Sequence, residues 1–143
     1  MPYFFSASLQ QVQRVITERN ERFERNYEAR DAVAVVRDYF VEDVHRPLLC
    51  PPGRRPLKGR AELAVHFAAM LIAAPYIRFG LFQTAVLSDS VQETGELELI
   101  DHGGMRVVHQ RTVLWRPIND QLRAQVSFLE AGPDRRAPIR LQS

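Results

Sequence analysis

The sequence predicts an α+β fold in which three N-terminal helices pack on one face of a curved, mainly antiparallel sheet. Two observations support this prediction. Apolar residues recur at helical spacing through the first half of the chain, and from Tyr76 onward they alternate with polar residues. The chain of 143 residues fits one domain, residues 1–143, with a core over about residues 9–132 and a loose tail over residues 133–143.

The first helix is expected to begin at a capping box formed by Ser8 and Gln11 and to end near Arg30. Its apolar residues recur at helical spacing, but this stripe breaks at Arg19 and Asn20. Because the opposite face is charged, the segment is typical of a long amphipathic helix.

Two further helices are expected before the sheet. Asp31 can cap a second helix that ends near Asp43. A short strand over residues 44–49 then leads into a loop whose prolines and glycines exclude a long regular element. The third helix is expected over residues 60–73, because Pro75 cannot continue it.

Four strands are expected over residues 76–87, 91–100, 105–116 and 121–131, joined by short turns as an antiparallel meander. One face of the third of these strands combines apolar, histidine and arginine side chains: Val107, His109, Arg111, Val113 and Trp115. On the last strand, one face is expected to carry Arg123, Gln125, Ser127 and Leu129. Sheets with such mixed faces often line a cavity.

Composition excludes several classes of function. A net charge of +2 is too small for a nucleic-acid-binding domain, and the basic residues 54–60 lie in a proline- and glycine-rich loop typical of a solvated surface. No apolar run approaches the roughly 20 residues that span a bilayer. The single cysteine, Cys50, excludes an internal disulfide, and a cytoplasmic location is expected. The histidines lack ligand spacing, so no metal site is expected.

Three segments in order, "YEARDAVAVVRDYFVEDV", "LKGRAELAVHFAAML" and "TVLWRPINDQLRAQVSFLEAG", resemble the SnoaL-like/ketosteroid-isomerase-like superfamily. Its cone-shaped fold is also named after nuclear transport factor. The resemblance spans residues 9–132 and implies a pocket between the concave sheet face and the helices, commonly without a cofactor. It also implies a homodimer formed through the outer sheet face. The activity stays open, because the superfamily includes isomerases, dehydratases, epoxide hydrolases, cyclases and non-catalytic binders.

The resemblance also bears on catalysis. The carboxylate base of ketosteroid isomerases falls near Leu48, yet no acid lies between Asp43 and Glu62, so their chemistry is not expected here. His109 and Arg111 instead share one strand face, which suggests an acid–base histidine beside an arginine that orients an anionic group. The alternative is that the strand phase is off by one, so that both face solvent or a dimer partner.

The remaining site candidates are side chains that would line the pocket or face it from the strands. Those expected to bind a ligand are Phe23, Tyr27, His45, Phe67, Val113, Trp115, Arg123, Gln125 and Ser127. The direction of His45 is open. If the apolar face of residues 91–100 lines the pocket, Glu93 alone among its acids points inward. Alternatively, Glu93, Glu96 and Glu98 are solvated or pair across strands with Arg106 and Arg111.

The sequence thus predicts a small-molecule pocket protein. One hypothesis is a cofactor-independent isomerase, dehydratase or cyclase that uses His109 and Arg111. A second is a module that binds a ligand without converting it. A third is a homodimerising interaction domain whose cavity is filled by its own side chains, among them Phe23, Tyr27 and Trp115.

Overall fold

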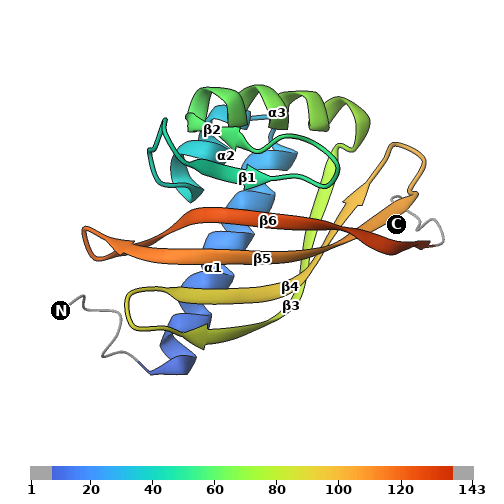
Figure 1. Cartoon of the computed structure of the whole chain (residues 1–143). Coiled ribbons are helices and arrows are strands. Elements are labelled where there is room, and N and C mark those ends of the chain that lie inside the picture. The colour runs from blue at the N-terminus through green and yellow to red at the C-terminus, as the bar shows by residue number, and fades with distance from the viewer. Residues whose placement is uncertain (1–7, 137–143) are drawn as a thin grey trace.

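The computed structural model describes residues 8–136, with side chains described as far as Glu130. Within this range three helices pack on one six-stranded, mostly antiparallel curved sheet (Figure 1). The helices are α1 (Leu9–Glu28), α2 (Ala32–Tyr39) and α3 (Gly59–Ala73). The strands are β1 (Pro47–Cys50), β2 (Leu57–Lys58), β3 (Tyr76–Val86), β4 (Val91–Ile100), β5 (Arg106–Ile118) and β6 (Gln121–Arg136). The expected α+β class is confirmed.

Helices α1 and α2 begin where their capping residues, Ser8 and Asp31, predict. The Ser8 hydroxyl accepts from the Gln11 backbone N–H, and the Gln11 side chain accepts from the Ser8 N–H, as a capping box requires. Helix α2 ends at Tyr39 rather than near Asp43, because the chain turns extended at Phe40 and the Val41 N–H donates to a carbonyl of β6. None of the described helices is long and apolar enough to cross a membrane.

The sheet order is β2-β1-β6-β5-β4-β3, so the expected meander forms its larger part. Strand β1 begins at Pro47 rather than at residue 44 and pairs in parallel with β6, while the two-residue β2 was not expected. Strand β6 runs five residues past its expected end at Ala131, into the segment expected to be a loose tail. Residues 137–143 of that tail lie outside the described residues.

A bulge in β6 changes which side chains face the core. Leu114 pairs with Val126 and Trp115 with Ala124, which leaves Gln125 as an extra residue. The side chains of Leu122 and Ala124 are therefore buried before the bulge, and Ser127 after it. The expectation that Arg123, Gln125 and Ser127 share one face is thus wrong, because strict alternation cannot anticipate an inserted residue.

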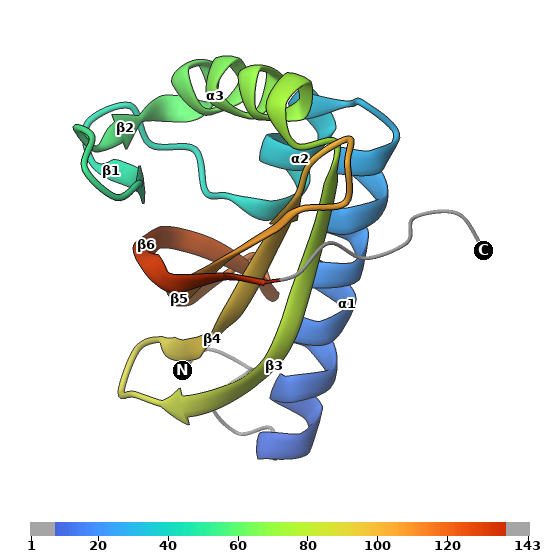
Figure 2. The ribbon, with the colours of Figure 1, turned by 90° about the vertical axis from the view of Figure 1, so that its right-hand side faces the viewer.

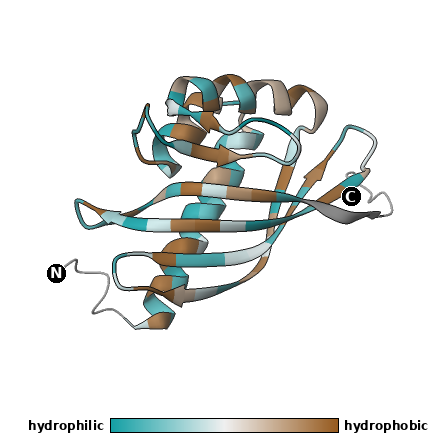
Figure 3. Ribbon diagram, viewed as in Figure 1, coloured by the Kyte–Doolittle hydropathy of each residue, from teal (hydrophilic) through white to brown (hydrophobic). Residues whose placement is uncertain are grey.

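Alternating hydrophobic and hydrophilic residues along the strands leave one apolar face for the helices (Figure 3). Helix α1 crosses this face, and Figure 2 shows β3 running alongside it at the sheet edge. Helices α2 and α3 close the end near β1 and β2 (Figure 1). The core between these layers is rich in aromatic rings, with Phe23 in contact with Tyr39, Phe67 and Phe79.

Strand β3 carries a second bulge, opposite Gly95. Phe79 pairs with Leu97 and Phe82 with Gly95, so one extra residue lies in β3 between them. A Cβ added to Gly95 would lie 2.8 Å from the Leu81 carbonyl oxygen and 2.9 Å from the Phe82 Cβ. Only glycine lets the bulged backbone approach β4 so closely.

We therefore expect Gly95→Ala to lower the free energy of unfolding by about 1–3 kcal/mol, the usual cost of overpacking a tight site. Gly80→Ala is the matched control in the same bulge, because the nearest atom to its added Cβ is 3.5 Å away. Urea denaturation of the two variants checks this. Equal losses would contradict the close fit at Gly95.

Candidate functional site

Five polar or amphipathic side chains from four elements meet inside the core. Glu93 comes from β4, Arg111 and Trp115 from β5, Asn20 from α1 and Tyr39 from α2. Glu93 is 1% exposed, Arg111 4% and Asn20 3%. Charged residues are almost never buried this completely unless they are paired. This buried network is therefore the feature of the fold that most needs a chemical explanation.

Hydrogen bonds account for most of the network. The Glu93 carboxylate accepts from Arg111 Nη2, from Asn20 Nδ2 at 3.0 Å and from Trp115 Nε1 at 2.9 Å. The Tyr39 hydroxyl donates to Asn20 Oδ1 at 2.7 Å and accepts from Arg111 Nη1 at 3.2 Å. Both Glu93 oxygens are thus occupied, which holds the carboxylate in a fixed orientation.

The protonation states follow from these contacts. Burial raises the pKa of Tyr39, so its hydroxyl stays protonated and able to donate. Burial works against the charged form of Arg111, but the Tyr39 oxygen and the Glu93 carboxylate outweigh it and raise the pKa of Arg111. The network therefore contains one positive and one negative charge in direct contact, with no net charge.

Next to the network lies a small cavity of about 30 Å³. Arg111, Ser127 and Tyr39 supply its polar lining, and the remaining described walls are apolar, with four phenylalanine rings among them. The Arg111 guanidinium carbon sits 4.4 Å from the centroid of the Phe79 ring, a cation–π contact. Arg111 Nε is buried and has no hydrogen-bond partner among the described residues. A charged donor without an acceptor is thus present beside an apolar cavity.

Four of the residues expected at the site line this cavity: Phe23, Phe67, Arg111 and Ser127. Trp115 is fully buried and acts through the network, as donor to Glu93. Val113 and Tyr27 are fully buried but are not among the cavity residues. The Tyr27 hydroxyl donates to the Ala74 carbonyl at 2.6 Å, and burial raises the pKa of Tyr27 to about 12.

The other expected residues lie away from the cavity. His45 is exposed in the loop before β1, and its backbone N–H donates to Asp43. Arg123 Nη1 donates to the Arg37 carbonyl at 2.8 Å, and Gln125 occupies the β6 bulge. The extra residue at the bulge exchanges the inward and outward positions of β6. Arg123 and Gln125 therefore do not lie on the same face as Ser127.

His109 and Arg111 have different surroundings. His109 is partly exposed, and its Nδ1 lies 3.3 Å from the Glu130 carbonyl oxygen. It does not line the cavity that Arg111 lines. Arg111 has Glu93 as its charged partner.

Besides Arg111 and Trp115, the sequence held signals for two more of the network residues. Asn20 occupies a position that continues the buried stripe of α1, so a polar residue there marks a buried hydrogen-bonding site. The inward position of Glu93 is confirmed, as is its pairing with Arg111, and on the other face of β4 Glu98 pairs with Arg106 at 3.5 Å. Tyr39 had no signal beyond its apolar periodicity.

Comparison with known proteins rests on structure alone. No family model matches the chain, and no curated protein matches it. An NTF2-like protein with a cystatin-like fold from Novosphingobium aromaticivorans superposes with a TM-score of 0.72 at 19% identity, over 87% of this chain and 84% of that one. A ketosteroid isomerase-like protein from Erwinia carotovora superposes with a TM-score of 0.65 at 15% identity, over 82% and 93%. The chain has the NTF2-like fold.

The sequence-based resemblance is thereby confirmed at the level of the fold. A candidate dehydratase of the NTF2-like family from Streptomyces avermitilis shares the NTF2-like fold as well, with a TM-score of 0.63 at 18% identity, over 89% of this chain and 100% of that one. Identities this low show the fold and no activity. Within residues 8–136 no cluster of three or more histidine, cysteine or acidic side chains is arranged to hold a metal ion.

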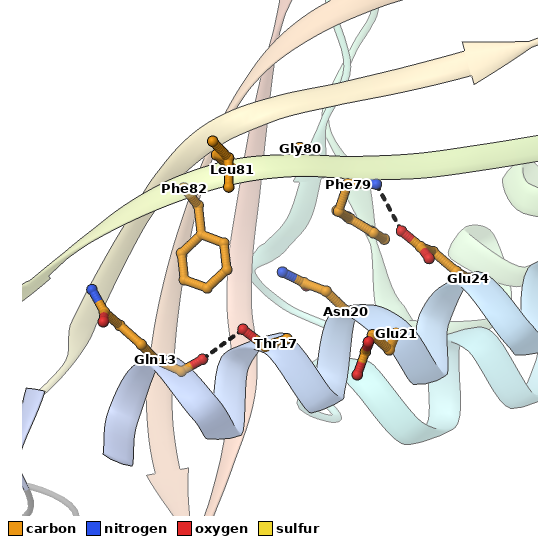
Figure 4. A pocket seen from close by; sticks show the side chains of 9 residues that line it. All are labelled: Gln13, Thr17, Asn20, Glu21, Glu24, Phe79, Gly80, Leu81 and Phe82. Atoms are coloured by element: carbon orange, nitrogen blue, oxygen red, sulfur yellow. Dashed lines mark hydrogen bonds between the residues drawn. The ribbon is translucent and has the colours of Figure 1, made fainter. Parts of the chain in front are cut away.

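A second hollow, a groove between α1 and the edge strand β3, is a further feature of this NTF2-like fold. Its volume is about 610 Å³. It is lined from β3 by residues 79–82 and from α1 by Gln13, Thr17, Asn20, Glu21 and Glu24 (Figure 4). Glu24 Oε2 accepts from the Phe79 backbone N–H at 2.8 Å, which satisfies a donor on the sheet edge. The groove thus reaches Asn20, and through it the buried network.

Burial raises the pKa of Glu24, and the nearby Glu28 and Glu21 carboxylates add to this effect, while the Phe79 N–H opposes it. A carboxyl whose pKa is higher in the folded protein lowers stability when it is ionised. The loss develops as the pH rises above the ordinary pKa of 4.5 and is complete above the folded-state pKa.

We expect Glu24→Gln to raise the free energy of unfolding at neutral pH, because the amide oxygen still accepts from Phe79 without a buried charge. The gain should shrink as the pH falls toward 4.5, where wild-type Glu24 becomes protonated. Urea denaturation at several pH values measures this difference. A gain that grows on acidification would contradict a raised pKa.

Proposed function

We propose that the protein is a small-molecule pocket protein that binds a small, largely apolar molecule with one uncharged oxygen acceptor, such as a ketone, aldehyde or ester. The acceptor oxygen pairs with Arg111, and the apolar part contacts the aromatic walls. One observation carries the proposal: Arg111 Nε is a buried charged donor without an acceptor, beside an apolar cavity. Such a donor costs about 1–3 kcal/mol or more until it is satisfied.

Charge balance favours a neutral ligand over an anionic one. Glu93 already neutralises Arg111 inside the core. A carboxylate ligand would leave one uncompensated negative charge in a desolvated space, which is unfavourable. A carbonyl oxygen accepts the hydrogen bond without adding charge. We therefore favour a neutral ligand at Arg111 over an anionic one.

Acetophenone and α-methylstyrene test the proposal, because they have similar shapes but only the ketone has an acceptor. Trp115 is the single tryptophan and belongs to the network, so its fluorescence reports binding. We expect the ketone to bind about tenfold more tightly or better, since a hydrogen bond to a charged group contributes about 1.5–3 kcal/mol.

Arg111→Lys is the informative variant, because lysine keeps the charge beside Glu93 but lacks Nε. We expect it to remove the preference for the ketone. His109→Ala is the control and should leave both affinities unchanged. Equal binding of the two probes by the wild type, or no binding at all, would refute the proposal and favour a core in which a buried water satisfies Arg111.

A second candidate function is catalysis by a cofactor-independent isomerase, dehydratase or cyclase. The observation that favours it is again Arg111, because a buried cationic donor at a carbonyl oxygen stabilises developing negative charge. Proteins described as ketosteroid isomerase-like and as a candidate dehydratase share the fold. In this hypothesis His109 carries out the proton transfer. A catalyst of that kind loses turnover on His109→Ala while its stability stays near that of the wild type.

The proposal includes a homodimer formed through the outer sheet face. Phe128 is 44% exposed in β6 and supports this, since a large exposed ring at the centre of a sheet face is typical of an interface. It pairs across the strands with Thr112. We expect Phe128→Lys to convert a dimer into a monomer without a change in secondary structure. Light scattering after size-exclusion chromatography measures this, and a wild-type monomer would refute the dimer.

A further inference from the structure

The cavity beside Arg111 is too small for a ligand of the proposed class in this structure. Its volume of about 30 Å³ can hold a water molecule, whereas a cavity that binds benzene measures about 150 Å³. A ligand of the proposed class can therefore enter only if at least one wall residue moves. Identifying that residue also identifies the route between solvent and the network.

Phe79 is the residue that separates the cavity from the groove between α1 and β3. It lines both the cavity and the groove, and among the described residues it alone is shared by these two hollows. Figure 4 shows Phe79 and Phe82 directed from β3 toward α1, with Asn20 opposite them. Movement of the Phe79 ring would join the groove to the space in front of Arg111.

The surroundings of Phe79 suit a movable wall. The bulge at Gly80 and Leu81 follows it directly, and Leu81 is 97% exposed, so little packing holds this stretch from outside. The Phe79 backbone, in contrast, is held by its N–H bond to Glu24. The ring can therefore rotate about a fixed backbone. Opening would break its cation–π contact with Arg111 and its ring contacts with Phe23 and Tyr39, and a ligand would replace them.

We infer that Phe79 is the gate through which a ligand passes from the groove to Arg111. This inference rests on the proposed function for the identity of the ligand. The gate itself is a property of the fold that can be tested without a ligand, because the fully buried Trp115 packs against Tyr39, which lines the cavity.

Acrylamide quenching of Trp115 fluorescence tests the gate. We expect Phe79→Ala to increase the quenching rate constant several-fold over the wild type, and Phe79→Leu to increase it less while preserving the fold. Met70→Ala is the control on the α3 side of the cavity, since Met70 is another partly exposed wall residue. It should leave quenching near the wild-type value. Urea denaturation confirms that the variants are folded.

Blocking the groove provides the second test. In a Cys50→Ser background, Thr17→Cys places a thiol in the groove, and Arg14→Cys places one on an exposed position of α1 that does not line it. We expect a bulky maleimide on the first thiol to slow both quenching and acetophenone association several-fold. The same label at the second should have no effect.

The possible failures are distinguishable. Quenching that rises in Met70→Ala but in neither Phe79 variant would overturn the gate and place the entrance beside α3. Acetophenone association that is unaffected by the label at position 17 would also overturn it, while leaving the proposed function intact. Absence of acetophenone binding, together with gated quenching, would refute the proposed function and support the gate.

Discussion

Replacing Glu93 by leucine is expected to lower the free energy of unfolding by about 3–5 kcal/mol, because it leaves Arg111 charged and unpaired in the core. Asn20 and Trp115 would also lose the acceptor that they now share. This is a large fraction of the roughly 5–15 kcal/mol that stabilises an ordinary domain. Urea denaturation followed by circular dichroism measures the loss.

Two controls distinguish the effect of breaking the ion pair on stability from the effect of removing a side chain. Glu98→Leu lies on the same strand, but its partner Arg106 is a quarter exposed, so we expect a loss of at most about 1 kcal/mol. The double variant Glu93→Leu/Arg111→Met removes both charges and should recover part of the stability, since a buried pair can be replaced by apolar side chains. A double variant as unstable as the sum of both single variants would contradict direct coupling.

Phe23→Ala is expected to cost about 3–5 kcal/mol, the usual loss for a large aromatic side chain in a core. Phe23 contacts the rings of Tyr27, Tyr39, Phe67 and Phe79, so its removal takes away contacts with three helices and a strand. The ring also lines the cavity. We therefore expect the variant to bind benzene, which stabilises it in a thermal melt.

Leu81→Ala is the control for this effect, because Leu81 is 97% exposed and its truncation should change stability by less than about 0.5 kcal/mol. Benzene should leave the melting temperature of this variant and of the wild type unchanged. A Phe23→Ala variant that is as stable as wild type, or insensitive to benzene, would show that the aromatic core does not surround this space.

The elements of the fold were predictable because their signals are local. The capping box at Ser8, the helical stripe of α1 and the period-two pattern after Tyr76 each follow from the side chains of one segment. The bulges at Gln125 and Gly80 could not be predicted, since the extra residue is specified by the neighbouring strand. Strand β2 was not predicted because a strand of two residues is too short to show an alternating pattern.

The site was predictable in part, because strand alternation identifies the inward residues of β4 and β5 but not the helix residues that meet them. Arg111 and Ser127 were placed on pocket-facing positions by strand alternation. For Glu93 the sequence allowed two positions, one facing the pocket and one solvated or paired across strands. The choice depends on which residue of β5 lies opposite Glu93, and this register is not visible in the sequence. Asn20 and Tyr39 come from helices whose approach to the sheet is set by packing, so their hydrogen bonds to Glu93 and Arg111 have no counterpart in the sequence.

The most direct test of the proposed site observes Arg111 itself in a nitrogen–proton correlation spectrum of the arginine side chains, assigned with Arg111→Lys. We expect the Arg111 Nε–H to exchange slowly with water and to shift when acetophenone is added, because it is buried and gains an acceptor. Surface arginines such as Arg14 should do neither. An Arg111 signal that exchanges rapidly, or that is unchanged at saturating ketone, would contradict a ligand site at this guanidinium.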